Sequence, residues 1–263
     1  MKVTGIQLDI AWEKPDANFK KAEKMARTAV ERGSSFLAFP EMFATGFSMN
    51  ADLVAGFAEE TRSFLSGLAR RLSVFILAGY VEPTDSKPAN ACSIYNPAGE
   101  EILNYRKIHP FSMAGEDQAF VAGERVHTVM VEGVRVTPFI CYDLRFPELF
   151  RSVAVHTDLF CVLANWPDPR RHHWSLLLQA RAIENQAYVL GVNRSGFGDG
   201  LNYTGDSALV DPMGKVMAEG TPGKEALVQG DVNPQEVYRI RKQFGFLADR
   251  RPELYERLEV GKA

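Results

Sequence analysis

The sequence predicts an α/β protein in which two mixed β-sheets stack face to face and helices cover their outer faces. Three observations favour this class. Strand-like runs alternate with helical periodicity early in the chain, two later segments contain hairpin turns, and most predicted strands are almost continuously apolar. Strands of this last kind are buried on both faces, so each sheet needs a covering layer on either side.

The predicted elements are spread along the whole chain. Strands are predicted at about 2–8, 35–39, 73–80, 91–96, 101–106, 134–140, 159–164, 187–193, 205–210, 214–218 and 225–231. Helices are predicted at about 16–32, 60–71, 147–154, 172–186 and 234–243. Residues 96–99 and 211–214 each place Pro ahead of Gly between β-rich arms, which predicts tight turns and antiparallel neighbours.

Length and composition are those of an ordinary globular protein. The chain has 263 residues, of which 46% are hydrophobic and 24% are charged, and no Ser/Gly tract, charge block or low-complexity segment resembles a linker. A single domain over residues 1–263 is therefore predicted. The net charge is −3, with 30 basic and 33 acidic residues intermixed, so no nucleic-acid partner is expected.

A cytoplasmic location and no membrane partner are also predicted. The chain begins with a strand-like segment in place of the apolar core of a signal peptide, and it has no apolar run long enough to span a bilayer. Three cysteines without close spacing argue against a disulfide framework and against a zinc site. No metal or organic cofactor is predicted, since no phosphate loop or dinucleotide-binding fingerprint is present.

The most informative cysteine is Cys141. It stands where the apolar run 134–140 gives way to the polar segment 142–148, a pattern typical of a buried strand that delivers a side chain to a site. Cys161 lies inside an apolar run and Cys92 alternates with other apolar residues in a predicted strand, so both are interpreted as core residues.

A carboxylate, an amine and a thiol each occur at or near a predicted strand end, at Glu41, Lys107 and Cys141. Reactive groups of α/β enzymes usually lie at such ends. A thiol attacks only as a thiolate, so it needs a base or a cation nearby. Glu41 is the candidate base, and Lys107 is the candidate partner of the thiolate and of the oxyanion formed on a carbonyl carbon. None of the five histidines offers an evident Cys/His pair.

Three segments carry a resemblance to a known family. Residues 39–41 (Phe-Pro-Glu), 105–109 (Tyr-Arg-Lys-Ile-His) and 141–148 (Cys-Tyr-Asp-Leu-Arg-Phe-Pro-Glu) resemble, in order, the signature segments of the nitrilase superfamily of carbon–nitrogen hydrolases. Segments 164–167, 179–189 and 205–207 extend the likeness over nearly the whole chain. The resemblance implies an αββα sandwich.

The resemblance also implies roles for individual residues. Glu41 matches the family's base, Lys107 its oxyanion partner and Cys141 its nucleophile, and Glu116 matches a second glutamate that follows the lysine. Strand alternation sends Lys107 and Tyr105 to one face, and a lysine on an inner face needs anionic partners, which Glu41 and Glu116 would supply. Glu116 itself is expected in a loop spanning residues 112–118.

Further residues are expected to complete the site. The backbone amide of Tyr142 is the predicted second oxyanion donor, because it follows the nucleophile at a strand-to-helix turn. Arg145 is interpreted as a support beside Cys141, and the start of the helix at 147 is expected to favour the thiolate through its dipole. Phe47 and Trp166 are predicted walls of the substrate pocket, with a core-capping role as the alternative for Trp166.

Within the family, the chain is most similar to the ω-amidase-like branch. This similarity implies hydrolysis of the terminal amide of small carboxylic acid monoamides such as 2-oxoglutaramate and 2-oxosuccinamate, through a thioester acyl-enzyme. The alternatives are a nitrilase in the narrow sense, an N-carbamoyl amidohydrolase or an acyl transferase with the same residues. A non-catalytic metabolite-binding member is disfavoured, because Glu41, Lys107 and Cys141 are all present.

A homodimer is the implied assembly. The resemblance implies helices that pack across a two-fold axis, and the helix after Cys141 is the candidate contact, with its apolar residues Leu149, Phe150 and Val153.

Overall fold

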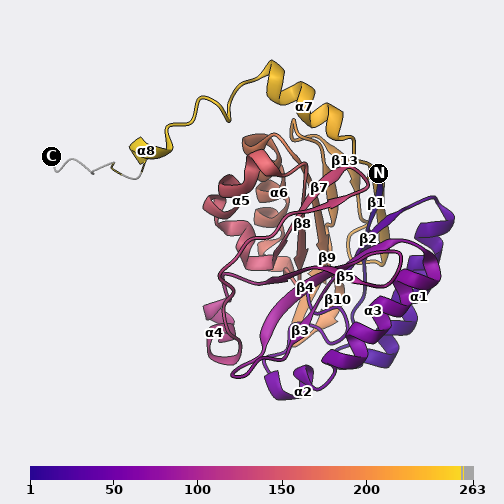
Figure 1. Ribbon diagram of the computed structural model, residues 1–263. Helices are drawn as coiled ribbons and strands as arrows, with labels where there is room; N and C mark the ends of the chain where they lie inside the picture. The colour runs from indigo at the N-terminus through magenta and orange to yellow at the C-terminus, as the bar shows by residue number, and fades with distance from the viewer. Residues whose placement is uncertain (256, 258–263) are drawn as a thin grey trace.

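The computed structural model describes residues 1–255 and 257, which contain two six-stranded mixed sheets stacked face to face (Figure 1). The first sheet has the order β14-β1-β2-β3-β4-β5, with β14 (Ala226–Asp231), β1 (Lys2–Gln7), β2 (Phe36–Ala38), β3 (Phe75–Glu82), β4 (Ala89–Tyr95) and β5 (Glu101–Arg106). The second has the order β13-β12-β9-β8-β7-β6, with β13 (Val216–Glu219), β12 (Ala208–Val210), β9 (Tyr188–Asn193), β8 (Leu159–Ala164), β7 (Val134–Ile140) and β6 (Val129–Val131).

Helices cover the outer faces of both sheets. α1 (Pro15–Glu31) and α3 (Ala58–Leu72) pack on β1 and β3 of the first sheet, and α6 (Arg171–Asn185) packs on β9 of the second beside α5 (Pro147–Val153) (Figure 1). Shorter helices are α2 (Ala51–Ala55), α4 (Glu116–Ala119), α7 (Pro234–Gln243), α8 (Pro252–Tyr255), η1 (Ser112–Ala114), η2 (Cys141–Arg145), η3 (Ala154–His156) and η4 (Asp168–Arg170). The predicted αββα architecture is confirmed.

Strand alternation explains the layers. In β2 the side chain of Leu37 packs in the apolar cluster under α1 and α3, whereas Phe36 and Ala38 belong to the cluster between the sheets. The sheets approach closely where β1 crosses β9, because a Cβ added at Gly5 would lie 3.0 Å from Cγ2 of Val192. The predictions for Cys92 and Cys161 agree with the structure, since both are buried in the cluster between the sheets.

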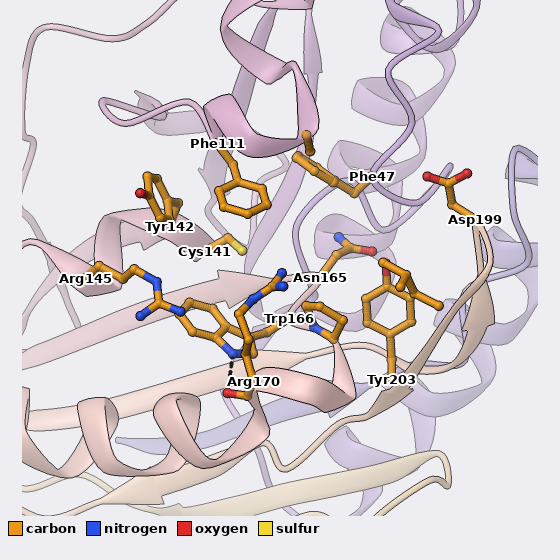
Figure 2. A pocket seen from close by; sticks show the side chains of 13 residues that line it. Phe47, Phe111, Cys141, Tyr142, Arg145, Asn165, Trp166, Arg170, Asp199 and Tyr203 are labelled. Carbon is orange, nitrogen blue, oxygen red and sulfur yellow. Dashed lines mark hydrogen bonds between the residues drawn. The ribbon is translucent and has the colours of Figure 1, made fainter.

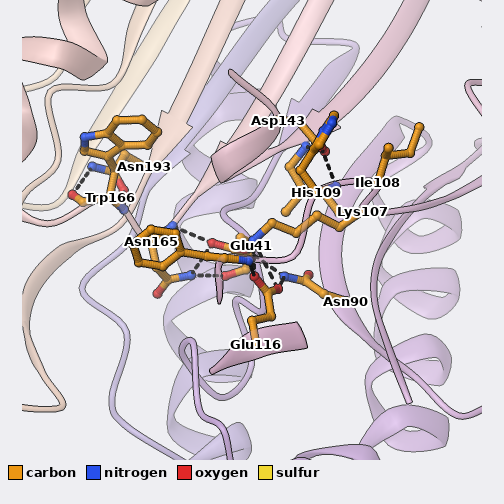
Figure 3. A network of polar contacts seen from close by, with 12 residues as sticks. Glu41, Asn90, Lys107, Ile108, His109, Glu116, Asp143, Asn165, Trp166 and Asn193 are labelled. Atoms are coloured by element: carbon orange, nitrogen blue, oxygen red, sulfur yellow. Dashed lines mark hydrogen bonds and ion pairs between the residues drawn. The ribbon is translucent and has the colours of Figure 1, made fainter. Parts of the chain in front are cut away.

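Strand direction brings the candidate site together. β2 and β5 both run parallel to β3, β2 directly and β5 through two antiparallel pairings, so their carboxyl ends emerge at the same edge of the first sheet. β7 and β8 are parallel neighbours, so the residues that follow them emerge at one edge of the second sheet. The segments after these four strands are the ones that meet in Figure 3.

The shortest elements were missed by the sequence analysis. β6, α2 and α4 are too short to show a period. The hairpin of β10 (Ser195–Gly198) and β11 (Leu201–Thr204) had a signal, because its turn is Asp199-Gly200, with φ of 48° and 72°. Asp-Gly is a strong signal for a two-residue turn in which both residues have positive φ.

The predicted dimer contact needs one correction. Phe150 is buried within its own chain, where it packs on Phe139 and Phe160, so it is not available to a partner. Exposed apolar side chains lie instead at Leu176 and Ile183, seven residues apart on α6 and therefore on one helix face. The homodimer itself stays a prediction. In the described part of the chain, no helix has the length and apolar character needed to cross a bilayer.

Candidate active site

Cys141 lies at the sharp turn between β7 and η2, and it is partly buried. Its φ is 46°, in the left-handed region, which is energetically unfavourable for a residue with a Cβ. Residues with such strained backbone conformations occur often at functional sites. Asp143 fixes this turn by accepting hydrogen bonds from the Ile140 amide at 3.1 Å and from the Tyr105 hydroxyl at 2.7 Å. The 3₁₀ helix η2 therefore begins at the cysteine, and α5, expected to lie against it, begins only at Pro147.

The Tyr142 amide is the second N–H of η2. The first N–H groups of a helix have no acceptor within that helix, so this amide remains free to bind an oxyanion beside Cys141. The tyrosine ring packs between Phe111 and Phe146, at centroid distances of 4.9 and 5.2 Å, and the ring contacts hold this turn of backbone in place.

Glu41, Lys107 and Glu116 form one buried ionic cluster (Figure 3). Lys107 Nζ lies 2.9 Å from Glu41 Oε1 and 2.8 Å from Glu116 Oε2. The expected inner face for Lys107 is thus observed, because Lys107 and Tyr105 are buried whereas Arg106 is exposed. Glu116 differs from expectation in its local structure, since it is the first residue of α4.

Asn90 joins the two carboxylates from β4. Its Nδ2 donates to Glu41 Oε1 at 2.8 Å and to Glu116 Oε1 at 2.7 Å, and the Phe111 amide donates to Glu116 Oε2 at 2.5 Å. The carboxylates are therefore fixed from two sides, by a side-chain amide and by the lysine ammonium. The sequence analysis missed Asn90, because it placed the start of this strand at residue 91.

Asn165 holds Glu41 from the other sheet. It follows β8, and its backbone amide donates to Glu41 Oε2 at 2.8 Å while its Nδ2 donates to the Glu41 carbonyl at 2.7 Å. The loop that carries Glu41 crosses β3 so closely that a Cβ at Gly79 would lie 2.6 Å from the Glu41 Cα. Met42, the next residue, has a φ of 43°, so this loop turns sharply at the carboxylate.

Burial and mutual charge set the ionisation of the cluster. Burial alone would lower the pKa of Lys107, but the negative charges of Glu116 and Glu41 raise it above its ordinary value. Burial raises the pKa of Glu116 despite the opposing cation of Lys107. Burial and then Glu41 raise the pKa of the Cys141 thiol well above its usual range, against the smaller opposing effect of Lys107.

The raised pKa sets the resting state of the nucleophile. At neutral pH Cys141 is a protonated thiol. It therefore requires a base at the moment of attack. Among the described residues, no three His, Cys, Asp or Glu side chains are grouped so as to hold a metal ion.

A small cavity of about 80 Å³ opens onto the cysteine (Figure 2). Its lining is largely aromatic, with a few charged groups: Phe47, Phe111, Ala114, Cys141, Tyr142, Arg145, Asn165, Trp166, Pro167, Arg170, Asp199, Leu201 and Tyr203. The structure thus brings Phe47 and Trp166 to the pocket, as predicted. Phe47 also links the pocket to the ionic cluster, because Lys107 Nζ lies 5.0 Å from the centre of its ring.

Two guanidinium groups lie on one side of the cavity (Figure 2). Arg145 stacks over the Trp166 ring at 4.7 Å, and Arg170 lies over the Phe111 ring at 5.4 Å. Burial, and next the charge of Arg170, lower the pKa of Arg145. Within the residues that the structure describes, no carboxylate is within ion-pairing distance of either guanidinium, whereas neighbouring Arg171 pairs with Asp206 at 2.7 Å. Arg145, interpreted as a support, therefore lines the pocket.

The opposite side of the cavity comes from the β10–β11 hairpin, which supplies Tyr203 and Asp199 (Figure 2). Buried Arg194 anchors this hairpin: its Nη2 donates to the carbonyls of Ile10 at 2.8 Å and Phe197 at 3.0 Å, and its guanidinium lies 4.4 Å from the centre of the Tyr203 ring. The sequence analysis did not consider Tyr203.

Asn193 positions the aromatic wall. Its Oδ1 accepts a hydrogen bond from the Trp166 amide at 2.7 Å, and its Nδ2 donates to the Trp166 carbonyl at 2.9 Å. A signal for this role was available, because Asn193 is a polar residue at the end of an apolar strand, the same pattern that singled out Cys141.

The structure thus places a partly buried thiol in a fold of two stacked sheets that also holds a buried Glu/Lys/Glu cluster, and sequence comparison assigns the family. The carbon-nitrogen hydrolase model matches residues 2–242. The chain belongs to the carbon–nitrogen hydrolase family, and it is an enzyme of the amidase type.

Two curated relatives cover nearly the whole chain. The omega-amidase YafV of Yersinia enterocolitica is 36% identical over 245 residues, which are 93% of this chain and 94% of the relative. The 2-oxoglutaramate amidase of Bacillus subtilis is 34% identical over 260 residues, 96% and 98% of the two chains. Among solved structures, a mutant amidase from Nesterenkonia sp. AN1 with acrylamide added at its active-site cysteine has a TM-score of 0.87 at 26% sequence identity. The match covers 98% of this chain and 99% of that structure.

Proposed function

We propose that this enzyme hydrolyses the terminal amide of short dicarboxylic acid monoamides, such as 2-oxoglutaramate, to the acid and ammonia through a thioester at Cys141. One observation carries the choice of substrate: two guanidinium groups without carboxylate partners line the same small cavity as the cysteine. A substrate with a carboxylate at one end and an amide at the other fits this arrangement, since the carboxylate completes the arginine pair.

Acylation begins at the protonated thiol. Glu41 takes the proton of Cys141, and the sulfur attacks the amide carbon, so that the carbonyl π electrons move to the oxygen. Lys107, whose pKa is held above its ordinary value by Glu116 and Glu41, remains a cation throughout and stabilises the oxyanion together with the Tyr142 amide. Glu41 then returns the proton to the amide nitrogen, the C–N bond breaks, and ammonia leaves a thioester behind.

Deacylation reverses the roles with water as the nucleophile. Glu41 takes a proton from water, the hydroxide attacks the thioester carbon, and Lys107 with Tyr142 again stabilises the oxyanion. The C–S bond breaks, the thiolate of Cys141 recovers the proton, and the carboxylic acid is released. Glu116 lies 2.8 Å from the ammonium of Lys107 and holds it in the same position during acylation and deacylation.

The names of the two relatives agree with this substrate class. One is an omega-amidase and the other a 2-oxoglutaramate amidase. The aromatic side chains of Phe47 and Trp166 give the short carbon chain an apolar path between the cysteine and the arginines. A cavity of about 80 Å³ favours short substrates over long acyl chains.

The test compares succinamate with butyramide, which has a similar chain but no carboxylate. Each charged contact is worth roughly 1.5–3 kcal/mol, so kcat/KM for succinamate is expected to be about 10–100-fold higher. Ammonia release from 2-oxoglutaramate, a matching nitrile and an N-carbamoyl compound completes the panel. A ratio near one would overturn the substrate assignment, and turnover of only the nitrile or the carbamoyl compound would replace the reaction.

A further inference from the structure

A buried polar atom beside the cavity has no role in the proposed reaction. Asn165 is 4% exposed and lines the cavity beside Cys141, and its side-chain oxygen Oδ1 is buried without a hydrogen-bond partner among the described residues (Figure 2). A buried acceptor without a donor is costly, so such an atom in a binding cavity points to a ligand that brings the donor.

The orientation of this side-chain amide is fixed by its neighbours. Nδ2 of Asn165 donates to two atoms of Glu41, the backbone carbonyl at 2.7 Å and the carboxylate Oε2 at 3.4 Å. Both atoms are acceptors, so a flipped amide would place Oδ1 against two oxygens and lose both hydrogen bonds. Oδ1 is therefore held on the other side of the group, as an acceptor that the protein leaves open.

We infer that Oδ1 of Asn165 accepts a hydrogen bond from the N–H of the scissile amide, which makes Asn165 a determinant of specificity for carboxamides. This inference rests on the proposed function. A primary amide has two N–H donors at its nitrogen, whereas an ester or a nitrile of the same acid has none at that position. A bound ester or nitrile therefore leaves Oδ1 buried and unpaired. The free-energy cost of that unpaired acceptor makes the site select amides over esters and nitriles.

The contact also serves the chemistry at the leaving nitrogen. Asn165 holds Glu41 through its backbone amide at 2.8 Å, so the open acceptor and the proton donor for ammonia release belong to one hydrogen-bonded unit. An N–H bound to Oδ1 restricts rotation of the amide nitrogen and favours an orientation in which its lone pair receives the proton from Glu41.

Asn90 offers a matched control. It also donates to Glu41, at 2.8 Å, and its own Oδ1 is likewise buried without a partner, but Asn90 is not among the residues that line the cavity. Asn90→Ala therefore weakens the support of Glu41 as Asn165→Ala does, and only Asn165→Ala removes an acceptor from the substrate.

The experiment measures kcat/KM for succinamate and for monomethyl succinate, in which a methyl ester replaces the amide and the carboxylate is kept, in the wild-type enzyme and in both variants. We expect Asn165→Ala to lower the amide-to-ester ratio by about tenfold, the scale of one hydrogen bond to a buried acceptor, whereas Asn90→Ala lowers both rates and keeps the ratio within about twofold. Equal losses for amide and ester in Asn165→Ala would overturn the inference and leave Asn165 as a positioning residue for Glu41.

A second measurement does not depend on the folding of Asn165→Ala. In Cys141→Ala, which cannot form the thioester, succinamate is expected to bind about tenfold more tightly than monomethyl succinate. Equal dissociation constants would overturn the inference while the proposed function stands, provided that the wild-type enzyme releases ammonia from succinamate. A wild-type enzyme that hydrolyses no carboxamide would overturn both.

Discussion

The ionic cluster and the arginine side of the cavity treat charge in opposite ways. In the cluster, the cation of Lys107 is buried between the carboxylates of Glu41 and Glu116, with distances of 2.8–2.9 Å and a further amide from Asn90. In the cavity, the guanidinium groups of Arg145 and Arg170 lie over aromatic rings, and Arg145 Nη2 also lies 3.2 Å from His173 Nδ1, but neither has a carboxylate partner among the described residues. The cation of the cluster is thus paired within the protein, whereas in the proposed reaction the carboxylate of the substrate would pair with the two arginines.

Because of this difference, the two regions should respond differently to amino-acid substitution. Buried ion pairs are expensive to break, because removal of one partner leaves the other charge without compensation. The charged groups of the cavity, Arg145, Arg170 and Asp199, lie on η2, η4 and a hairpin turn, which are short connecting elements. Substitutions in the cluster should therefore affect reaction and stability together, and those in the cavity should change the choice of substrate.

The largest effect is expected from Cys141→Ala. Loss of the nucleophile should abolish hydrolysis of every substrate and leave the fold intact, because the alanine fits a partly buried site. The measurement is ammonia release together with circular dichroism. Cys92→Ala and Cys161→Ala are the matched controls, since both thiols are buried in the core, and they should keep turnover at some cost in stability. More than a trace of activity in Cys141→Ala would contradict the mechanism.

Lys107→Met should come next, with kcat reduced by about 10²–10³-fold, the scale for loss of one oxyanion donor. The variant should also lose stability by about 3–5 kcal/mol, because two buried carboxylates lose their cation. Chemical denaturation and steady-state kinetics measure the two effects. Unchanged stability together with lost activity would show that the ion pairs of Lys107 do not contribute to the free energy of unfolding.

The stability loss in Lys107→Met should depend on pH. Burial already raises the pKa of Glu116 in the folded protein, and without the opposing cation of Lys107 this pKa rises further. A carboxyl whose folded pKa is raised binds its proton more tightly in the folded state, so its contribution is present at low pH and is lost as the pH rises through that pKa. The destabilisation at pH 8 should therefore exceed that at pH 5, and the opposite order would contradict this account.

The same contrast explains what the sequence could predict. Glu41 and Cys141 follow apolar strands at the points where the sequence becomes polar, and Lys107 is indicated by strand alternation and by the order of the motifs. Each of these residues can therefore be identified from the sequence alone. Arg145 is four residues from the cysteine in a 3₁₀ helix, and its direction depends on that helix and on the Trp166 ring, which a strand period does not describe.

Two further cases show different limits. Tyr203 reaches the cavity only because β10 and β11 form a hairpin whose Asp199-Gly200 turn signal was overlooked, so that miss was avoidable. Asn90 was beyond local analysis, since its role depends on two carboxylates that are 49 and 26 residues away along the chain. The role of a polar residue within a buried strand can be assigned only when its hydrogen-bond partners in the fold are known.

The next prediction concerns the cavity. Arg145→Met should lower kcat/KM for succinamate by about 10–100-fold, through loss of the charged contact, and should leave butyramide nearly unchanged because the apolar stem still packs on Trp166. Arg171→Met is the matched control: this arginine is paired with Asp206 and does not line the cavity, so neither substrate should be affected. Parallel losses for both substrates in Arg145→Met would show that Arg145 supports the fold of the pocket.

The smallest effect is expected from Asp199→Asn, at the exposed hairpin turn that forms part of the cavity wall. Its carboxylate has the same sign as the proposed substrate, so its removal should raise kcat/KM for succinamate by about two- to fivefold, the modest scale of exposed charges. Asparagine preserves the turn, because Asn-Gly accepts the positive φ of both residues as Asp-Gly does.

Salt dependence separates this effect from a change in pocket shape. Charges near solvent are screened over about 8 Å at physiological ionic strength and about 3 Å at 1 M salt, so the gain in Asp199→Asn should disappear at high salt. Butyramide, which has no charge, should show no gain at any salt concentration. A gain in kcat/KM that persists at 1 M salt or extends to butyramide would mean that Asp199 affects substrate binding through the shape of the hairpin and not through its charge.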